Sequence, residues 1–513
     1  MATACRRRRT DATRETPLDG RRDDQRDARE GQARLGGVAD GLVVPLKPGN
    51  AGGGKEPWFE EDAGRSAGQE TGVNLQAPES VQKLQSALHA KAKAEPGYRF
   101  YALYDKVYRD DILHFAYRLA RSNGGAPGVD GQDFADIEAY GVERWLGELA
   151  QALREKTYRA QAVRRVWIPK ANGTRRPLGI PTVRDRVAQT AAVIVLTPIM
   201  EADLDPSQYA YRPGRNAHDA VRHVHRLLNT GYTEAVDADL TDYFGSVPHA
   251  ELMRCLARRI VDRHLLALIK QWLVMVVEED DGRGGSTRTT TAKDAKRGTP
   301  QGAPISPLLS NLYLRRFLRG WKTLGVERKL RARIVSYADD FVILCRGSAV
   351  QAEAAMRSMM KTLKLTVNDA KTHLRRLPAE RFDFLGYTFG RCYSPKTGRA
   401  YIGTRPSAKS IRKVSRTIHE LTSRRWTLLD AHERVARLNR TMIGWANYFS
   451  LGPVSSAYRA IDRHAKSRLR RWLCKKHKHV GRGLARFPDE YLYNTLGLTR
   501  LPARTRDLPW ANA

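Results

Sequence analysis

Two adjacent carboxylates, Asp339 and Asp340, stand inside an apolar run, with Ile334-Val335 before them and Phe341-Val342-Ile343-Leu344 after them. The β-rich residues on either side predict a tight hairpin with both aspartates at its turn. Neighbouring carboxylates repel each other and raise each other's pKa, whereas a bound divalent cation keeps both ionised. The pair is therefore a candidate cation site, although taken alone such a pair is more often a solvated turn.

A third carboxylate stands in a similar setting about a hundred residues upstream. The stretch 234–244 predicts a strand that carries Asp239, with aromatic residues just beyond it. Asp239, Asp339 and Asp340 can thus form one three-carboxylate cluster. Hard oxygen ligands in that number suit Mg²⁺, which completes its shell with waters and substrate phosphates. Two such ions can clamp the attacking and leaving oxygens of a phosphoryl transfer, and the pattern indicates that chemistry.

A basic turn precedes the strand that carries Asp239. Lys170 and Arg176 bracket the short segment 171–174, which lies between two predicted apolar strands. Lysine acts as a point charge and arginine as a bidentate fork, so this hairpin tip can lie over a nucleoside triphosphate. The alternative is a solvated tip with incidental charge.

A glycine-rich loop lies between the two aspartate segments, where residues 298–302 read Gly-Thr-Pro-Gln-Gly. Gly298 and Gly302 flank the rigid Pro300, which lets the backbone approach a base pair more closely than a Cβ would allow. Gln301 adds a neutral side chain that can hydrogen-bond. A buried helix is predicted to begin at Ser306, directly after the loop.

In their order along the chain, these motifs and others resemble those of the reverse transcriptases that bacterial group II introns encode, which also serve as maturases. The resemblance spans roughly residues 97–498. Its motifs lie at 125–131, 163–170, 176–182, 211–215, the Asp239 strand, 298–302, 337–340, 365–371 and 382–387. Each motif alone is weakly specific, whereas their common order is strongly specific.

The resemblance implies roles for two residues near the nucleotide. Phe244, five positions after Asp239, would lie under the incoming sugar and exclude a 2′-hydroxyl, which implies deoxynucleotide substrates. Lys371 would lie near the departing pyrophosphate, where it could donate a proton or neutralise charge. Core packing of Phe244 and a plain surface position for Lys371 are the alternatives.

The resemblance also implies contacts with template and primer. A hairpin that contains Phe382 and Phe384 would brace the primer end, and these two rings are equally compatible with core packing. The other implied template and primer contacts are Tyr337, Gly298, Pro300 and Gly302.

The charge balance points independently to a nucleic-acid partner. The 513 residues include 89 Lys plus Arg against 55 Asp plus Glu, a formal net charge of +34. Such an excess favours phosphate binding that weakens steeply with salt. Residues 405–513 hold about three basic residues for each acidic one, whereas residues 1–80 are nearly charge-balanced. That first stretch has few apolar residues and predicts a disordered head without a secretory signal.

The C-terminal part predicts an α-helical thumb. Residues 438–449 place apolar side chains at spacings of three and four. The segment 444–449 resembles domain X of the family, which acts as thumb and maturase surface. Structured RNA is bound largely through phosphates and 2′-hydroxyls, so the basic run that follows is a candidate RNA contact. The candidate side chains are Arg463, Lys466, Arg468, Arg470, Arg471 and Lys475.

The five cysteines form no Cys-x-x-Cys pair. This pattern indicates a reducing cytoplasm and no structural zinc site. Many members of the family have a His-Asn-His endonuclease domain with cysteine pairs, and we expect none here. No apolar run reaches transmembrane length. We therefore expect a cytoplasmic, nucleoid-associated protein without a membrane partner.

The expected fold class is α+β, a right-hand polymerase with fingers and palm followed by an α-helical thumb. The chain is long enough for two folded domains. The expected parts are a disordered head at 1–80, fingers and palm at 81–400, the thumb or domain X at 401–478, and a short basic region at 479–513 that resembles a reduced DNA-binding region.

The resemblance implies an RNA-directed DNA polymerase that uses two Mg²⁺ ions and deoxynucleoside triphosphates. It also implies binding of a group II intron RNA, to assist splicing, and of a target DNA, to support intron mobility. A splicing-only maturase is one alternative, which the complete set of three aspartates disfavours, because a scaffold has no need for a self-repelling cluster. A retron or diversity-generating reverse transcriptase is another, which the segment 444–449 disfavours.

Overall fold

A computed structural model describes residues 75–169, 175–280, 285–394, 397–506 and 508. All of them belong to the second of two compact units, Leu42–Ala513. Residues 1–74 of the predicted head lie outside the described residues. Helix α1 (Glu79–Ala94) begins just before the end of that head, which was predicted at residue 80. None of the described helices is both long and apolar enough to cross a membrane.

Helix α6 (Val183–Glu201) is the central element of the N-terminal half. Nearly every side chain from Val183 to Met200 is buried, because apolar residues surround this helix instead of forming one stripe. Helices α1 and α3 pack against it. The other helices of this part are α2 (Tyr104–Val107), α3 (Asp110–Asn123), α4 (Phe134–Tyr140), α5 (Val142–Arg154), α9 (His249–Ala257) and α10 (Arg263–Leu273).

A four-stranded sheet, here called the fingers sheet, has the order β2-β1-β4-β5. Strands β1 (Val163–Pro169) and β2 (Arg175–Ile180) are antiparallel, which confirms the predicted basic hairpin. Residues 170–174 at its tip, Lys170 among them, lie outside the described residues. Strands β4 (Val277–Asp280) and β5 (Ser286–Thr289) complete the sheet.

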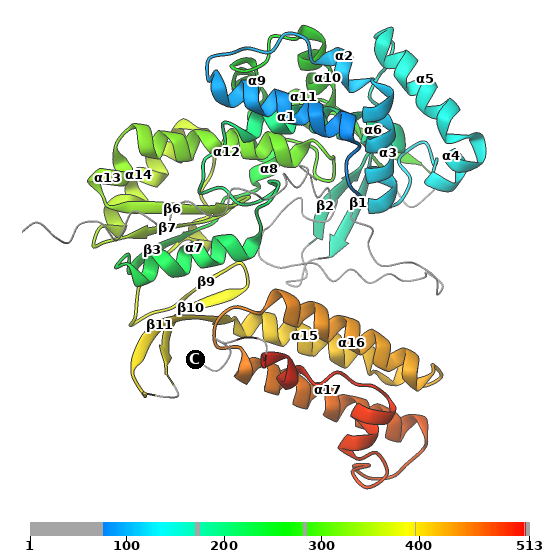
Figure 1. Cartoon of the computed structure of the whole chain (residues 1–513), viewed down its shortest axis with the longest axis vertical. Helices are drawn as coiled ribbons and strands as arrows, with labels where there is room; N and C mark the ends of the chain where they lie inside the picture. The colour runs from blue at the N-terminus through cyan, green and yellow to red at the C-terminus, as the bar shows by residue number, and fades with distance from the viewer. Residues whose placement is uncertain (1–74, 170–174, 281–284, 395–396, 507, 509–513) are drawn as a thin grey trace, which may run out of the picture. The chain divides into compact units, whose positions relative to one another are not determined.

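A second four-stranded sheet, here called the palm sheet, has the order β6-β7-β3-β8 and is antiparallel throughout. Alternate residues of its strands face two different cores, one with α12 and α14 and the other with α7. Figure 1 shows α12 and α14 on one face and α7 on the other. The elements are β3 (Glu234–Ala238), β6 (Ala332–Tyr337), β7 (Asp340–Cys345), β8 (His373–Arg376), α7 (Ala217–Asn229), α12 (Ser306–Thr323) and α14 (Ala349–Thr362).

Short elements connect these layers. They are α8 (Tyr243–Ser246), α11 (Thr291–Ala295), α13 (Val326–Lys329) and a 3₁₀ turn at Asp369–Lys371. Helix α12 begins at Ser306, as predicted, and its first turn contains Pro307, a residue suited to that position because its missing N–H would have no intrahelical partner there.

Among the described residues, three antiparallel strands and three α-helices form most of the C-terminal part. The strands β9 (Phe382–Phe384), β10 (Tyr387–Tyr393) and β11 (Ala400–Pro406) lie in the order β11-β10-β9. Helices α15 (Ala408–Leu421), α16 (Ala431–Tyr448) and α17 (Ser455–Lys476) form the thumb. Trp445 and Phe449 are each 2% exposed, so the predicted amphipathic helix buries both rings in the thumb core.

The thumb core continues beyond the predicted boundary at residue 478. Phe487, Leu492 and Leu498 are buried in the same core as α16 and α17. Asp462 of α17 accepts a hydrogen bond from the Tyr493 hydroxyl at 2.6 Å and another from the Leu501 N–H at 3.2 Å. The segment up to residue 506 therefore packs as part of the thumb. The α+β class with a helical C-terminal domain is confirmed.

Candidate active site

The Asp339–Asp340 pair lies at a tight hairpin, as predicted. Tyr337 at the end of β6 pairs with Asp340 at the start of β7, so the turn consists of Ala338 and Asp339. Ala338 has a φ of 56°, a left-handed conformation that turns of this kind require. Asp339 is 8% exposed and Asp340 2% exposed, which is unusual for carboxylates.

Asp239 reaches the same end of the palm sheet from the neighbouring strand. The last pair between β3 and β7 is Ala238 with Phe341, and one further step in this antiparallel register brings Asp239 opposite Asp340. The backbone thus places the three predicted carboxylates on adjoining strand ends. Asp239 is 9% exposed, so all three lie in a place that excludes most water.

Lys371 forms an ion pair with Asp239. Its Nζ lies 2.8 Å from Oδ2 of Asp239, and the backbone carbonyl of Asp239 accepts a hydrogen bond from the N–H of Asn368 at 2.8 Å. An isolated bridge between Leu240 and Val367 holds the two segments together. Two residues predicted from separate motifs are therefore brought into direct contact.

The donor chemistry of the carboxylates fits a hard divalent cation. Mg²⁺ prefers carboxylate oxygens and usually keeps several waters. Within the described part of the chain, however, no three Asp, Glu, His or Cys side chains converge into a ready-made metal cage. Asp239 is directed to Lys371, so full convergence on a cation requires Asp239 to exchange that ammonium.

A hydrogen-bonded chain links the fingers sheet to the palm sheet beside the aspartates. The Nε of Arg176 donates to Oε1 of Gln301 at 3.3 Å, and Nε2 of Gln301 donates to Oδ1 of Asp242 at 3.3 Å. Burial lowers the pKa of Arg176, against the opposing effect of the negative charge of Asp339. Asp242 was not predicted as a site residue, because the only indication in the sequence was its position three residues after Asp239.

The glycines of the 298–302 loop permit contacts between protein backbones. Gly302 has a φ of 106°, and a Cβ there would lie 2.2 Å from the carbonyl oxygen of Gly179 in β2. The Gly179 N–H donates to the Gln301 carbonyl at 2.7 Å. Gly298 has a φ of 97°, and a Cβ would lie 3.2 Å from the Gly245 carbonyl oxygen. The loop is thus fixed against β2, with Pro300 and Gln301 half-buried between the glycines.

The predicted aromatic contacts lie in or near the core. Phe244 is 2% exposed, Phe382 3% and Phe384 1%, and the Phe382 ring stacks on Phe389 with centroids 5.2 Å apart. Tyr337 is half-buried, and burial raises the pKa of its hydroxyl. The roles of these rings toward sugar, template and primer stay predictions.

Three of the six predicted RNA-binding side chains are engaged inside the thumb. Arg470 is 7% exposed, donates to the Phe487 carbonyl at 2.8 Å and pairs with Asp489. Lys466 also pairs with Asp489, at 2.6 Å. Arg468 donates to the Oγ1 and carbonyl oxygen of Thr422 at 3.1 and 3.2 Å. These three groups hold the thumb together.

The other three candidates, Arg463, Arg471 and Lys475, are exposed. Their spacings of eight and four residues place them along one side of α17, because a helix repeats every 3.6 residues. The basic run thus divides into a set that is engaged inside the thumb and an exposed stripe that presents its charges to solvent.

Two regions of the chain match known families. Residues 168–389 match the family described as reverse transcriptase (RNA-dependent DNA polymerase). Residues 411–487 match the family described as group II intron, maturase-specific domain. The first region contains all three aspartates, and the second contains α16, α17 and most of α15.

Three similar proteins cover different shares of the chain. Protein YkfC of Escherichia coli (strain K12) is 32% identical over 368 residues, which are 64% of this chain and 93% of that protein. An uncharacterized 91 kDa protein in a cob intron of Schizosaccharomyces pombe is 24% identical over 67% of this chain and 50% of its own length. The group II intron-encoded protein LtrA of Lactococcus lactis subsp. cremoris is 33% identical over 42% of this chain and 34% of its own length. The chain thus spans nearly all of the first relative and half or less of the other two.

Proposed function

This chain belongs to the family of group II intron reverse transcriptases and maturases, and on that premise we propose that it copies RNA into DNA at a two-Mg²⁺ site built on Asp239, Asp339 and Asp340. The observation that supports this assignment best is the register of β3 against β7, which continues from Ala238 and Phe341 to Asp239 and Asp340. Three low-exposure carboxylates on adjoining strand ends have no evident purpose in a purely structural protein.

Mg²⁺ bound at these carboxylates would supply positive charge to the attacking and leaving oxygens of nucleotide transfer. Asp339 and Asp340 provide oxygen ligands from a turn whose backbone is fixed by the β6–β7 pairing. Asp239 provides the third carboxylate once it has released Lys371. The ends of these adjoining strands would thus hold the carboxylate ligands of both ions.

Lys371 has a second position in this proposal. Its side chain is 58% exposed, so the ammonium can leave Asp239 and turn toward the phosphates of a bound deoxynucleoside triphosphate. There it would neutralise the charge that develops on the departing pyrophosphate or donate a proton to it. The same lysine therefore neutralises Asp239 before the substrate arrives and the phosphates afterwards.

Arg176 and Gln301 are proposed to hold the incoming nucleotide between the fingers and palm sheets. Arg176 is half-buried beside Asp339, and its guanidinium can bind a phosphate in bidentate fashion. Lys170 is proposed to join it from the hairpin tip. Phe244 is proposed to select deoxynucleotides from the floor of the same site.

The maturase activity is assigned to the thumb. The exposed stripe of Arg463, Arg471 and Lys475 on α17 is proposed to bind phosphates of the intron RNA, whose own fold performs the splicing chemistry. Binding of this RNA together with a target DNA would allow the polymerase to copy the intron at its new site, which is the step that mobility requires.

Exchange of one carboxylate tests the assignment. We expect Asp339→Asn to lower Mg²⁺-dependent primer extension on an RNA template by at least about a hundredfold, with protein-assisted splicing largely kept. Asp369→Asn makes the same chemical change on a side chain that is 81% exposed and is the control, for which we expect normal extension. Full extension by Asp339→Asn would refute the site.

A further inference from the structure

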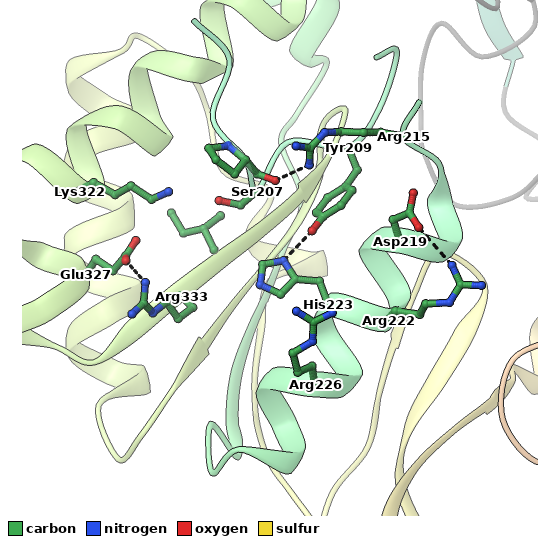
Figure 2. Close-up of a pocket in the computed structure, with 12 residues that line it drawn as sticks. Ser207, Tyr209, Arg215, Asp219, Arg222, His223, Arg226, Lys322, Glu327 and Arg333 are labelled. Atoms are coloured by element: carbon green, nitrogen blue, oxygen red, sulfur yellow. Dashed lines mark hydrogen bonds and ion pairs between the residues drawn. The ribbon is translucent and has the colours of Figure 1, made fainter. Parts of the chain in front are cut away.

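A pocket of about 390 Å³ lies at the outer, β6 edge of the palm sheet, and none of its lining residues belongs to the candidate active site. Its walls come from α7, from the first half of the edge strand β6, from the end of α12 with α13, and from the segment 206–209 (Figure 2). Arg333 in this pocket and Tyr337 beside the aspartates are four residue steps apart along β6, about 13 Å of strand. The two sites therefore share a strand but have different lining residues.

Cationic side chains outnumber anionic ones in the wall of this pocket. Five of its lining residues are Arg or Lys and two are Asp or Glu. Asp219 pairs with Arg222 at 3.1 Å, and Glu327 pairs with Arg333. The cations are Arg215, Arg222, Arg226, Lys322 and Arg333.

Two arginines supply the excess charge. Arg226 is exposed on α7 and, among the described residues, forms no ion pair. Arg215 lies with its guanidinium 5.5 Å from the centre of the Tyr209 ring and donates to the Pro206 carbonyl at 2.7 Å, which leaves its charge unneutralised. Lys322 pairs with Asp205 at 2.7 Å, just outside the wall. The pocket thus holds more positive charge than its own carboxylates balance.

His223 lies in the middle of these cations, and their positive charges contribute to its lowered pKa. Figure 2 shows its imidazole between Tyr209 on one side and Arg333 on the other, and the Tyr209 hydroxyl is hydrogen-bonded to its Nδ1 at 2.9 Å. Burial, together with the charges of Arg226, Lys322 and the other cations, lowers the pKa of His223 to about 4. Burial is the larger cause of this lowering, and the positive charges around the imidazole that add to it also attract an anion.

The chemistry of the wall selects phosphate rather than a base. The exposed rim is formed mainly by charged side chains. Of the two aromatic rings in the wall, Tyr209 already has a guanidinium over it, and His223 is half-buried and hydrogen-bonded to Tyr209. A base therefore finds no free ring on which to stack. Arg222 and Arg226 are one helical turn apart on α7, with Arg333 across the gap, so the cations are distributed over more length than a single small anion occupies.

We propose that this pocket, at the edge of β6, binds phosphates of an RNA backbone and is a contact for structured RNA separate from the polymerase site and from the stripe on α17. This inference rests on the proposed function only for the identity of that RNA as an intron. A different reading is that Arg333 and its neighbours merely protect the free edge of β6 from pairing with another strand. Arg222 and Arg226 distinguish the two readings, because they lie on α7 and not on the edge strand.

The test is the salt dependence of RNA binding by the full chain. The probe is a fluorescein-labelled hairpin RNA, titrated with Arg222→Gln/Arg226→Gln and with the unchanged protein between about 50 and 200 mM salt. Loss of two phosphate contacts is expected to weaken binding and to reduce the slope of log Kd against log salt by roughly 1 to 2. A slope equal to that of the unchanged protein would overturn the inference.

Two further variants separate a specific contact from a change of net charge or fold. Lys270→Gln/Lys361→Gln removes the same charge from two exposed positions outside the pocket and is expected to leave the slope unchanged. Arg222→Lys/Arg226→Lys keeps both charges and is expected to restore most of the slope. The slope could fall as much in Lys270→Gln/Lys361→Gln as in Arg222→Gln/Arg226→Gln, or fail to recover in Arg222→Lys/Arg226→Lys. Either result would contradict a phosphate contact at this pocket.

Two additional measurements distinguish RNA phosphates from a free nucleotide and separate RNA binding from polymerase activity. If Arg222→Gln/Arg226→Gln changed the affinity for dATP but not for RNA, the pocket would be a free-nucleotide site and the inference would fail. Primer extension on a pre-annealed RNA template and DNA primer is expected to continue in this variant. Absence of extension by the unchanged protein would refute the proposed function, while the RNA-binding result would stand by itself.

Discussion

The ammonium of Lys371 lies 2.8 Å from a carboxylate oxygen of Asp239, although 132 residues separate them in the sequence. The pair connects two of the residues on which the proposed polymerase site depends. In the proposed site, Asp239 would be a common partner of the lysine and the metal ion, because both require the same carboxylate oxygens. Lys371 and Mg²⁺ should therefore compete for Asp239.

We expect Lys371→Gln to have two opposite effects on DNA synthesis. The maximal rate of nucleotide incorporation should fall by about a hundredfold, because the departing pyrophosphate loses its neutralising group. The Mg²⁺ concentration for half-maximal rate should fall by up to about fivefold, because an ion pair this exposed is worth at most about 1 kcal/mol. Single-nucleotide incorporation over a Mg²⁺ titration measures both.

Lys364→Gln is a closely matched control for this variant. Lys364 pairs with Glu251 at 2.7 Å, and the side-chain exposures are 53% and 12%, against 58% and 12% for Lys371 and Asp239. Neither the maximal rate nor the Mg²⁺ requirement should change. An unchanged or increased Mg²⁺ requirement in Lys371→Gln would contradict the competition.

Gly302→Ala is expected to destabilise the fold, because the new Cβ would meet the Gly179 carbonyl oxygen at 2.2 Å. Gly325→Ala introduces a Cβ at a similarly left-handed position, φ 71°, with no heavy atom within 4 Å. Both substitutions thus place an alanine at a positive φ, whereas the steric overlap is confined to the first. Gly302→Ala should lower the free energy of unfolding by about 1 to 3 kcal/mol more than Gly325→Ala. Urea unfolding checks this, and equal losses would show that the loop does not lie against β2.

His223 should make the stability of the protein depend on pH. Its pKa is lowered to about 4 in the folded chain from an ordinary 6.5. As the pH falls below 6.5, the unfolded chain binds a proton at this residue that the folded chain does not bind, so the free energy of unfolding decreases down to about pH 4. Above pH 6.5 the imidazole of His223 is neutral in both the folded and the unfolded chain, so the free energy of unfolding is not reduced by this residue.

His223→Asn removes the titrating group but keeps a hydrogen-bond acceptor for Tyr209. The free energy of unfolding of the unchanged protein minus that of the variant should therefore decrease as the pH is lowered from 6.5 toward 4. The contributions of the other histidines to the free energy of unfolding are the same in both proteins and cancel in this difference. A difference that stays flat or grows over this range would show that His223 is not held neutral by its burial and its cationic neighbours.

The polymerase site is the part of this protein that the sequence predicts most fully. Asp239 and the Asp339–Asp340 pair follow or interrupt apolar strands, and a strand pattern with a carboxylate at its end is visible in local sequence. The hairpin and the helix from Ser306 are confirmed for that reason, whereas the strand predicted over 234–244 ends at Ala238, directly before Asp239. The pairing of Lys371 with Asp239 was not predicted, because it depends on which strands become neighbours.

The thumb shows where local sequence is insufficient. In a run of basic residues, Arg470 looks no different from Arg471, yet one is 7% exposed and the other lies on the surface. The distinction depends on Asp489, which lies 19 residues away and pairs with Arg470. For the same reason, residues 479–506 look like a separate basic region, whereas their scattered apolar side chains complete the core of the thumb. Only tertiary packing makes these roles visible.

The most direct test of the proposed polymerase site is the number of metal ions that bind at the three aspartates. Electron paramagnetic resonance can count Mn²⁺, used as a probe for Mg²⁺, in a complex with RNA template, terminated DNA primer and incoming deoxynucleoside triphosphate. We expect two ions per chain that the Asp339→Asn variant does not retain, while Asp369→Asn retains both. Equal Mn²⁺ binding by the unchanged protein and by Asp339→Asn would contradict a metal site at this hairpin.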